Sequence, residues 1–186
     1  MYYSRQVGRG ATLNMNIPPE RSGRMNASVV KVMAAAGKAI NDTFHKNVAV
    51  APAVSGKCTT GIATLTVPDG AAFDYVVSAE DMTKGARFAN YSIEYQRAGS
   101  SEWEVLVPPC PPKGCGGSGA PDGGQLGDRP DGHDPRDSHI GHKRIDVPIV
   151  KTSSGIKALR LNCIAAFEEP VHVKSFSIHK KTVPWE

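Results

Sequence analysis

Carboxylates are the side chains in this sequence best suited to acid–base or nucleophilic chemistry, because hydrolases use pairs of them in those roles. The candidates are Glu80, Asp81, Glu102, Glu104, Glu168 and Glu169. All of them lie at the ends of short alternating segments or in the turns between them. Charged residues in such places are typical of solvated turns, so we predict that role for them.

Glycine-containing runs and serines complete no known catalytic or nucleotide-binding motif. Ser55-Gly56-Lys57 resembles the end of a phosphate loop, but the position five residues before Gly56 holds Ala51 in place of glycine. The run Val7-Gly8-Arg9-Gly10 comes before a predicted strand, the reverse of the order in a dinucleotide fingerprint. No Gly-Xaa-Ser-Xaa-Gly elbow occurs. The sequence therefore indicates no cofactor.

The segment 108–137 is rich in glycine and proline and predicts a long surface loop. Aspartates recur in it every three residues, with histidines close by: Asp128, Asp131, Asp134, Asp137, His133, His139 and His142. Clustered carboxylates suit hard cations. The spacing differs from that of calcium loops, however, and Pro130 and Pro135 interrupt it. We therefore predict a polar loop held by Asx-turns and no metal site.

Four cysteines, Cys58, Cys110, Cys115 and Cys163, allow three pairings if all are bridged, and the sequence leaves the pairing open. Cys163 lies in an alternating apolar run and is predicted to be a core thiol. Three Asn-Xaa-Ser/Thr sequons permit a secretory interpretation, since such sequons are N-glycosylation acceptors: Asn26-Ala-Ser28, Asn41-Asp-Thr43 and Asn90-Tyr-Ser92.

Length and charge exclude some classes of protein. The chain has 186 residues, of which 40% are hydrophobic, enough for one domain or one domain plus a fragment. The net charge is +4, but the basic excess lies at the two ends with no basic stripe interleaved with aromatics, so no nucleic-acid surface is expected. No apolar run is long enough for a transmembrane helix, and the first residues lack the pattern of a signal peptide.

The first 47 residues predict one strand and one helix. Thr12 to Ile17 alternate polar and apolar side chains until Pro18-Pro19 ends the pattern. Apolar residues then recur at helical spacing behind Asn26 as a candidate N-cap: Val29, Met33, Ala36, Ile40 and Phe44. One strand and one helix close no core, so this piece predicts the last β-α unit of a larger domain.

From residue 48 onward the pattern changes to period two. Seven short strands are predicted, over 62–67, 73–77, 91–96, 103–107, 143–150, 158–165 and 171–179. Short alternating strands separated by turn residues are typical of an antiparallel β-sandwich, with one wet face and one core face per strand.

Several runs resemble glycoside hydrolase family 29, the α-L-fucosidases. The run Tyr2 to Pro19, which contains VGRGATLNMNIPP, resembles the segment that closes the catalytic barrel of that family, and Gly37, Ile40, Phe44 and Asn47 match its following helix. The run 73–91 with Trp103, and IGHKRI at 140–145, resemble the family's C-terminal discoidin-like β-sandwich. The resemblance covers the chain apart from the loop 108–137 and its flanks.

This resemblance implies a mainly β fold. Residues 1–47 would be the end of an incomplete (β/α)8 barrel, and 48–186 a discoidin-like antiparallel β-sandwich with the insert 108–137. The whole enzyme would be a retaining glycosidase that hydrolyses terminal α-linked L-fucose from glycans, without a cofactor. Family members are typically secreted, lysosomal or vacuolar. The nucleophile-bearing motifs of the family are not in this chain, so no catalytic residue is assigned and the chain alone is expected to be inactive.

One substrate-binding candidate follows from the barrel. Active-site residues lie at the C-terminal ends of barrel strands. If Leu13, Met15 and Ile17 face the helices, then Asn14 and Asn16 point toward the interior, and Asn16 is nearer the mouth. Asn16 either contacts fucose or bonds a neighbouring strand or loop.

A different class of function remains an alternative, a stand-alone glycan-binding or adhesive sandwich without catalysis. Such a protein would stack exposed aromatic rings on sugar faces. The candidate rings are those of Tyr91, Tyr95 and Trp103, although strand alternation predicts that most of them belong to the core. The sequence leaves the oligomeric state open.

Overall fold

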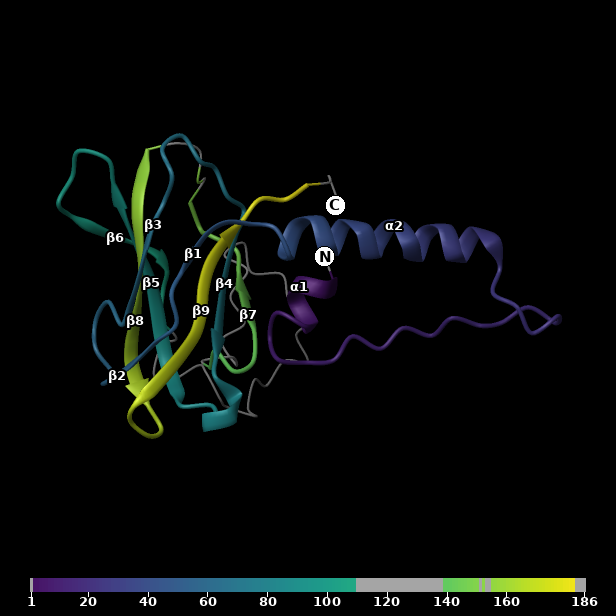
Figure 1. The fold of residues 1–186 in the computed structure, drawn as a ribbon, viewed down its shortest axis with the longest axis horizontal. Helices are drawn as coiled ribbons and strands as arrows, with labels where there is room; N and C mark the ends of the chain where they lie inside the picture. The colour runs from purple at the N-terminus through teal and green to yellow at the C-terminus, as the bar shows by residue number, and fades with distance from the viewer. Residues whose placement is uncertain (1, 110–138, 151, 153–154, 183–186) are drawn as a thin grey trace, which may run out of the picture.

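The computed structural model describes residues 2–109, 139–150, 152 and 155–182. Two helices precede a two-sheet sandwich (Figure 1). The helices are α1 (Tyr2–Gln6) and α2 (Ala27–Phe44), and a short 3-10 turn, η1 (Met82–Lys84), follows β4. The strands are β1 (Asn47–Ala51), β2 (Val54–Gly56), β3 (Ala63–Thr66), β4 (Tyr75–Glu80), β5 (Phe88–Arg97), β6 (Trp103–Val107), β7 (Arg144–Asp146), β8 (Ile156–Ala166) and β9 (Val171–His179).

The strands form two antiparallel sheets. One has the order β1-β9-β4-β7, with β2 also paired to β9, and the other has the order β3-β8-β5-β6. The core lies between them and includes Phe73, Val76, Phe88, Ile93, Leu159, Leu161, Phe176 and Ile178. The predicted mainly β antiparallel sandwich is confirmed, and β1 and β2 are strands that the sequence pattern did not predict.

The alternation of wet and core faces predicted from the period-two pattern holds for β3, whereas β4, which begins in the more fully apolar run 73–77, is buried throughout. In Ala63–Thr66 buried and exposed residues alternate, whereas all six residues of Tyr75–Glu80 are buried. Strand β4 lies between β9 and β7, and its outer side chains Tyr75 and Val77 are covered by Phe44 of α2. A strand covered on both faces has no wet face.

The helix predicted behind Asn26 forms, with the Asn26 side chain accepting a hydrogen bond from the Ser28 amide at 2.9 Å. The strand predicted over Thr12 to Ile17 does not form, and this expectation is corrected: residues 11–20 have no regular secondary structure. Extended backbone becomes a strand only when another strand pairs with it. Among the described strands, none pairs with this segment.

Helix α2 points away from the sandwich and only its last turns reach it (Figure 1). Its buried residues are Ala39, Thr43 and Phe44, while Val30 and Val32 are 46% and 64% exposed. Val30 and Val32 lie outside the predicted apolar stripe, whose residue Phe44 is buried and whose other members are half-buried: Val29, Met33, Ala36 and Ile40. Within the described ranges, no helix is long and apolar enough to span a membrane.

Candidate functional site

The N-terminal segment, the end of α2 and the outer face of one sheet meet in a small apolar cluster that we call the junction. It consists of Tyr3, Ile40, Phe44, Tyr75, Val77 and Ile145. The Phe44 ring centroid lies 5.2 Å from that of Tyr3 and 5.1 Å from that of Tyr75. Aromatic pairs at these distances stabilise a contact beyond the area that they bury. The junction therefore holds the last turn of α2 on the sandwich.

A buried histidine from β9 links the junction to the helix end. His179 Nδ1 lies 3.1 Å from the Thr43 carbonyl oxygen, and His179 Nε2 lies 2.9 Å from Ser177 Oγ. A carbonyl only accepts, so Nδ1 carries the proton and donates, and in the neutral ring Nε2 accepts from the Ser177 hydroxyl. Burial lowers the pKa of His179, and the nearby Lys143 ammonium lowers it further. Burial thus favours the neutral ring of His179 in the folded chain.

The run Val7 to Gly10 docks on β7, the edge strand of the sheet. The Ile145 amide donates to the Gly8 carbonyl at 2.8 Å, and Arg9 forms an isolated antiparallel bridge with Arg144. A Cβ on Gly8 would lie 2.3 Å from the Ser4 carbonyl oxygen and 2.6 Å from the Ile145 Cβ. Gly8 is therefore required for this close approach of two backbones.

Behind this edge lies a buried polar network. The Tyr91 hydroxyl donates to the Asp146 carboxylate at 2.8 Å, and Arg144 Nε donates to the same carboxylate at 3.1 Å. All three residues are buried, and burial, together with the negative charge of Asp146, raises the pKa of Tyr91 well above its usual value. The pairing with Asp146 allows Arg144, the arginine of IGHKRI, to be buried, because a buried charge requires a partner.

Asn16, the substrate-binding candidate, lies in the extended segment 11–20 and is exposed. Its neighbours Asn14 and Met15 are exposed as well, while Leu13 and Ile17 are half-buried. The role of Asn16 stays a prediction.

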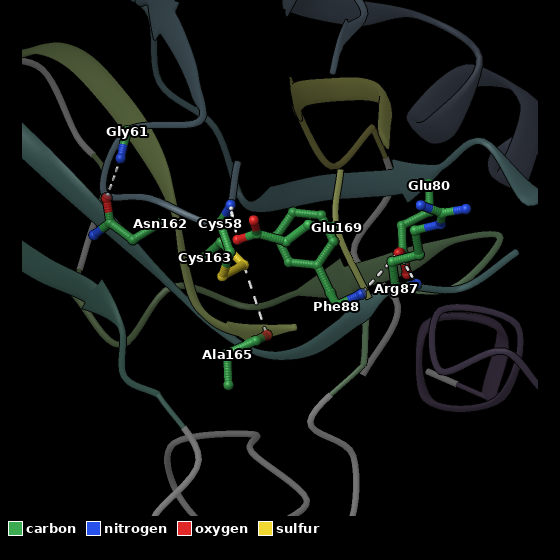
Figure 2. The surroundings of a disulfide bond; sticks show 9 residues. All are labelled: Cys58, Gly61, Glu80, Arg87, Phe88, Asn162, Cys163, Ala165 and Glu169. Carbon is green, nitrogen blue, oxygen red and sulfur yellow. Dashed lines mark hydrogen bonds between the residues drawn. A yellow bond between two sulfur atoms is a disulfide. The ribbon is translucent and has the colours of Figure 1, made fainter. Parts of the chain in front are cut away.

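Glu80 corrects one expectation, since it is buried and not a solvated turn residue. One carboxylate oxygen accepts from the backbone amides of Arg87 and Phe88 at 2.6 and 3.0 Å (Figure 2). The other accepts from the Gly141 amide at 2.6 Å. These three bonds join the end of β4, the start of β5 and the turn of IGHKRI.

The remaining carboxylates with described contacts have structural partners. Glu104 accepts from the Tyr95 hydroxyl at 2.6 Å and from Arg97 Nε at 2.9 Å, and these bonds lower its pKa. Asp81 caps η1, accepting from Thr83, which lowers the pKa of Asp81. These hydrogen bonds favour the charged carboxylates as structural acceptors.

Cys163 is not a core thiol, which corrects the sequence-based expectation. It forms a disulfide with Cys58, 105 positions away along the chain (Figure 2). The bond joins β8 to the loop after β2, where the Cys58 amide donates to Glu169 at 2.9 Å. Alternation along β8 correctly predicted that Cys163 faces inward, but periodicity carries no information about a partner so distant.

Cys110 and Cys115 lie outside the described residues, as do the aspartates at 128, 131, 134 and 137 and His133. Of the residues that the structure does describe, no group of three or more His, Cys, Asp and Glu side chains is placed to hold a metal ion. The predicted polar loop of 108–137 therefore stays a prediction.

Two of the three aromatic candidates for glycan stacking are in the core. Tyr91 and Tyr95 are each 2% exposed. Trp103 is half-buried, and the Arg160 guanidinium carbon lies 4.3 Å from its ring centroid. Cation–π stacking of this kind covers one face of the indole.

The sequence did not predict the structural roles of three residues around the junction: Gly8, Glu80 and His179. A glycine is required at position 8 because Ile145, far along the chain, lies close to it, and the local sequence around Gly8 carries no sign of that contact. Glu80 ends a run that is apolar except for Ser78, and a carboxylate there signals burial only once its three amide donors are known.

The fold was compared with known proteins. No protein-family model matches the chain, and no curated protein matches it. Solved structures do match. A glycoside hydrolase 29 family member from an unknown rumen bacterium has a TM-score of 0.69 at 21% identity, over 99% of this chain and 28% of that one. A Ruminococcus gnavus GH29 fucosidase in complex with fucose has a TM-score of 0.65 at 17% identity, over 97% and 35%.

A candidate α-L-fucosidase from Bacteroides thetaiotaomicron VPI-5482 matches with a TM-score of 0.67 at 22% identity, over 96% of this chain and 32% of that one. The chain spans only 28%, 35% and 32% of the length of these three structures, in the order given. Identities this low show similarity of fold. The chain has the fold of the C-terminal portion of glycoside hydrolase family 29 α-L-fucosidases.

Proposed function

We propose that the chain is the C-terminal portion of an α-L-fucosidase that hydrolyses terminal α-linked L-fucose from glycans with retention of configuration. Residues 1–47 form the closing part of the catalytic (β/α)8 barrel, and 48–186 form a discoidin-like sandwich. The main support is that matches to GH29 structures extend over nearly the whole chain, the N-terminal segment and α2 included.

The exposed N-terminal parts of the structure support the same proposal. Segment 12–19 is extended and pairs with no strand that the structure describes (Figure 1), and α2 leaves apolar side chains in solvent: Val30 at 46% and Val32 at 64% exposed. A neighbouring barrel strand would satisfy the free backbone groups, and barrel helices would cover the apolar side chains. The junction then serves to hold the sandwich against the barrel.

The catalytic chemistry in this proposal belongs to the barrel. A retaining glycosidase places two carboxyl groups about 5–5.5 Å apart on either side of the anomeric carbon, one as nucleophile and one as acid and base. We assign neither role to this chain. Asn16 is the residue we propose to reach the substrate, through its amide, at the end of the last barrel strand.

The test has two steps. The transcript is first sequenced upstream of the Met1 codon, where barrel strands are expected in frame. The extended protein and residues 1–186 alone are then assayed on an aryl α-L-fucoside, and only the extended protein is expected to turn over substrate. An Asn16→Ala variant of the extended protein should raise KM, with Asn14→Ala as the matched control. Turnover by pure 1–186 would contradict the proposal, as would a transcript that encodes no barrel.

A further inference from the structure

The structure contains evidence for the compartment in which this chain folds. Cys58 and Cys163 form a disulfide that joins two distant parts of the sandwich. Structural disulfides form and persist in oxidising compartments such as the endoplasmic reticulum and the extracellular space. The endoplasmic reticulum is also where a eukaryotic cell attaches N-linked glycans, so the three sequons of the chain can be compared in the folded structure.

Two of the sequons lie in regular secondary structure. Asn41 is exposed on α2, but the third residue of its sequon, Thr43, is buried and hydrogen bonds to Thr182 at 3.1 Å. Asn90 is half-buried on β5, where it pairs with Ala165 of β8. A bulky glycan on Asn90 would have to leave from within the sheet. Neither site presents a whole sequon to solvent.

The third sequon, Asn26-Ala-Ser28, is exposed at all three positions. It lies where the chain enters α2, at the end of the helix that points away from the sandwich (Figure 1). The Asn26 side-chain oxygen accepts from the Ser28 amide at 2.9 Å and from the Ser28 hydroxyl at 2.6 Å. This Asx-turn places the Asn26 side-chain amide beside the Ser28 hydroxyl, and these are the two groups that define a sequon.

We propose that Asn26 carries an N-linked glycan. In the transfer, Asn26 Nδ2 loses one proton and forms a bond to C1 of the sugar, while the bond from C1 to the diphosphate of a lipid-linked oligosaccharide breaks and the lipid diphosphate leaves. The Asn26 oxygen stays free to cap α2 through Ser28, so modification and capping are compatible. The remaining Nδ2 hydrogen can still donate to Glu20, now 2.7 Å away.

The experiment is to express the 186-residue chain behind a cleavable signal peptide in a eukaryotic cell. Peptide-N-glycosidase treatment converts each glycosylated Asn to Asp, so peptide mapping in heavy-oxygen water reports the modified position. Both the secreted and the cell-retained pools are mapped, which makes the result independent of secretion. We expect Asn26 to be labelled in the chain. Absence of label at Asn26, with or without label at Asn41 or Asn90, would overturn the proposal.

Matched variants separate the modification from the helix cap. Ser28→Ala destroys the sequon but keeps the Asn26 cap, and it should abolish the label at position 26. Ser28→Thr preserves the sequon and should keep it. Asn41→Gln should leave the glycan at Asn26 unchanged. Because the readout is mass and not fucoside turnover, this proposal and the proposed function can fail separately.

Discussion

The Glu80 carboxylate shows how much one buried side chain organises in this fold. It accepts hydrogen bonds from three backbone amides, those of Arg87, Phe88 and Gly141. We expect Glu80→Gln to destabilise the chain by about 1–3 kcal/mol, because the amide NH2 of Gln would face a backbone donor. Urea unfolding at pH 7 measures the change.

The matched control for Glu80 is Glu168, whose side chain is 71% exposed and 3.8 Å from Arg87. Glu168→Gln should change the free energy of unfolding by less than about 0.5 kcal/mol. Equal effects of the two substitutions would show that the three amide bonds of Glu80 contribute nothing specific.

Replacing Gly8 with alanine and replacing Gly37 of α2 with alanine should change the stability of the chain in opposite directions. A Cβ at Gly8 would meet the Ser4 carbonyl oxygen at 2.3 Å, so Gly8→Ala must push the N-terminal segment off β7 and should cost about 1–3 kcal/mol. Gly37 has nothing within 4 Å of its Cβ position, so Gly37→Ala should stabilise α2 by about 0.5–1 kcal/mol. Thermal unfolding measures both changes: the midpoint should fall for Gly8→Ala, where two backbones lie close together, and rise for Gly37→Ala, where only helix propensity changes.

His179 predicts a pH dependence of stability with a definite sign. Its pKa is lowered by burial in the folded chain, so below about pH 6.5 the unfolded chain binds a proton that the folded chain resists. The contribution of His179 to the free energy of unfolding is therefore fully present above that pH. It is lost as the pH falls toward the lowered pKa of His179 in the folded chain. Thermal unfolding from pH 7.5 to 5 should show a steeper loss for the native chain than for His179→Gln. Identical slopes would contradict the assignment.

Elements differ in how far the sequence predicts them. Helix α2 forms where a helical stripe follows Asn26, and β3, β5, β6, β8 and β9 form where alternation was clear. The segment Thr12 to Ile17 has equally clear alternation yet is no strand, because pairing depends on a partner that local pattern does not contain. Strand β4 is fully buried for the same kind of reason, since the covering Phe44 is remote in sequence.

Residues around the candidate site were also hard to predict when their role depends on a partner far away in the sequence. Asn16 was chosen from its place on a predicted strand, whereas the residues next to the junction act through partners far away in the chain. His179 contacts Thr43, and Gly8 contacts Ile145. Fold class and family resemblance depend on runs of adjacent residues, so both could be predicted from the sequence. Tertiary contacts such as the Cys58–Cys163 bond were not.

Because the disulfide joins the loop after β2 to strand β8, we expect the stability of the sandwich to depend on whether the bond is oxidised or reduced. It closes a loop of 105 positions between the region after β2 and strand β8. Reduction should lower the free energy of unfolding by about 2–5 kcal/mol, because the reduced unfolded chain regains freedom. Unfolding with and without a phosphine reductant measures the loss, and a Cys58→Ser, Cys163→Ser double variant should be insensitive to the reductant. If the native chain is equally insensitive, the bond does not contribute to stability.

For the molecule as a whole, the sandwich is expected to fold without the N-terminal piece, since its two sheets enclose a core of their own. Protease should cut first in the exposed segment between α1 and α2. The junction adds a second expectation, because Phe44 covers Tyr75, Val77 and Ile145. A chain beginning at Ala39 should therefore be more stable than one beginning at Val48 by about 2–3 kcal/mol, the amount gained by burying one large apolar side chain.

Thermal unfolding of the two truncated chains tests both statements at once. The chain from Val48 should still unfold in one cooperative transition, but several degrees below the chain from Ala39, as about 2–3 kcal/mol implies for a domain of this size. A matched Phe44→Ala substitution in the longer chain should reproduce most of that drop. If the shorter chain shows no cooperative transition, residues 48–186 are not an independent domain. If the two midpoints coincide, the junction does not hold α2 on the sandwich, and its proposed role of joining sandwich to barrel fails with it.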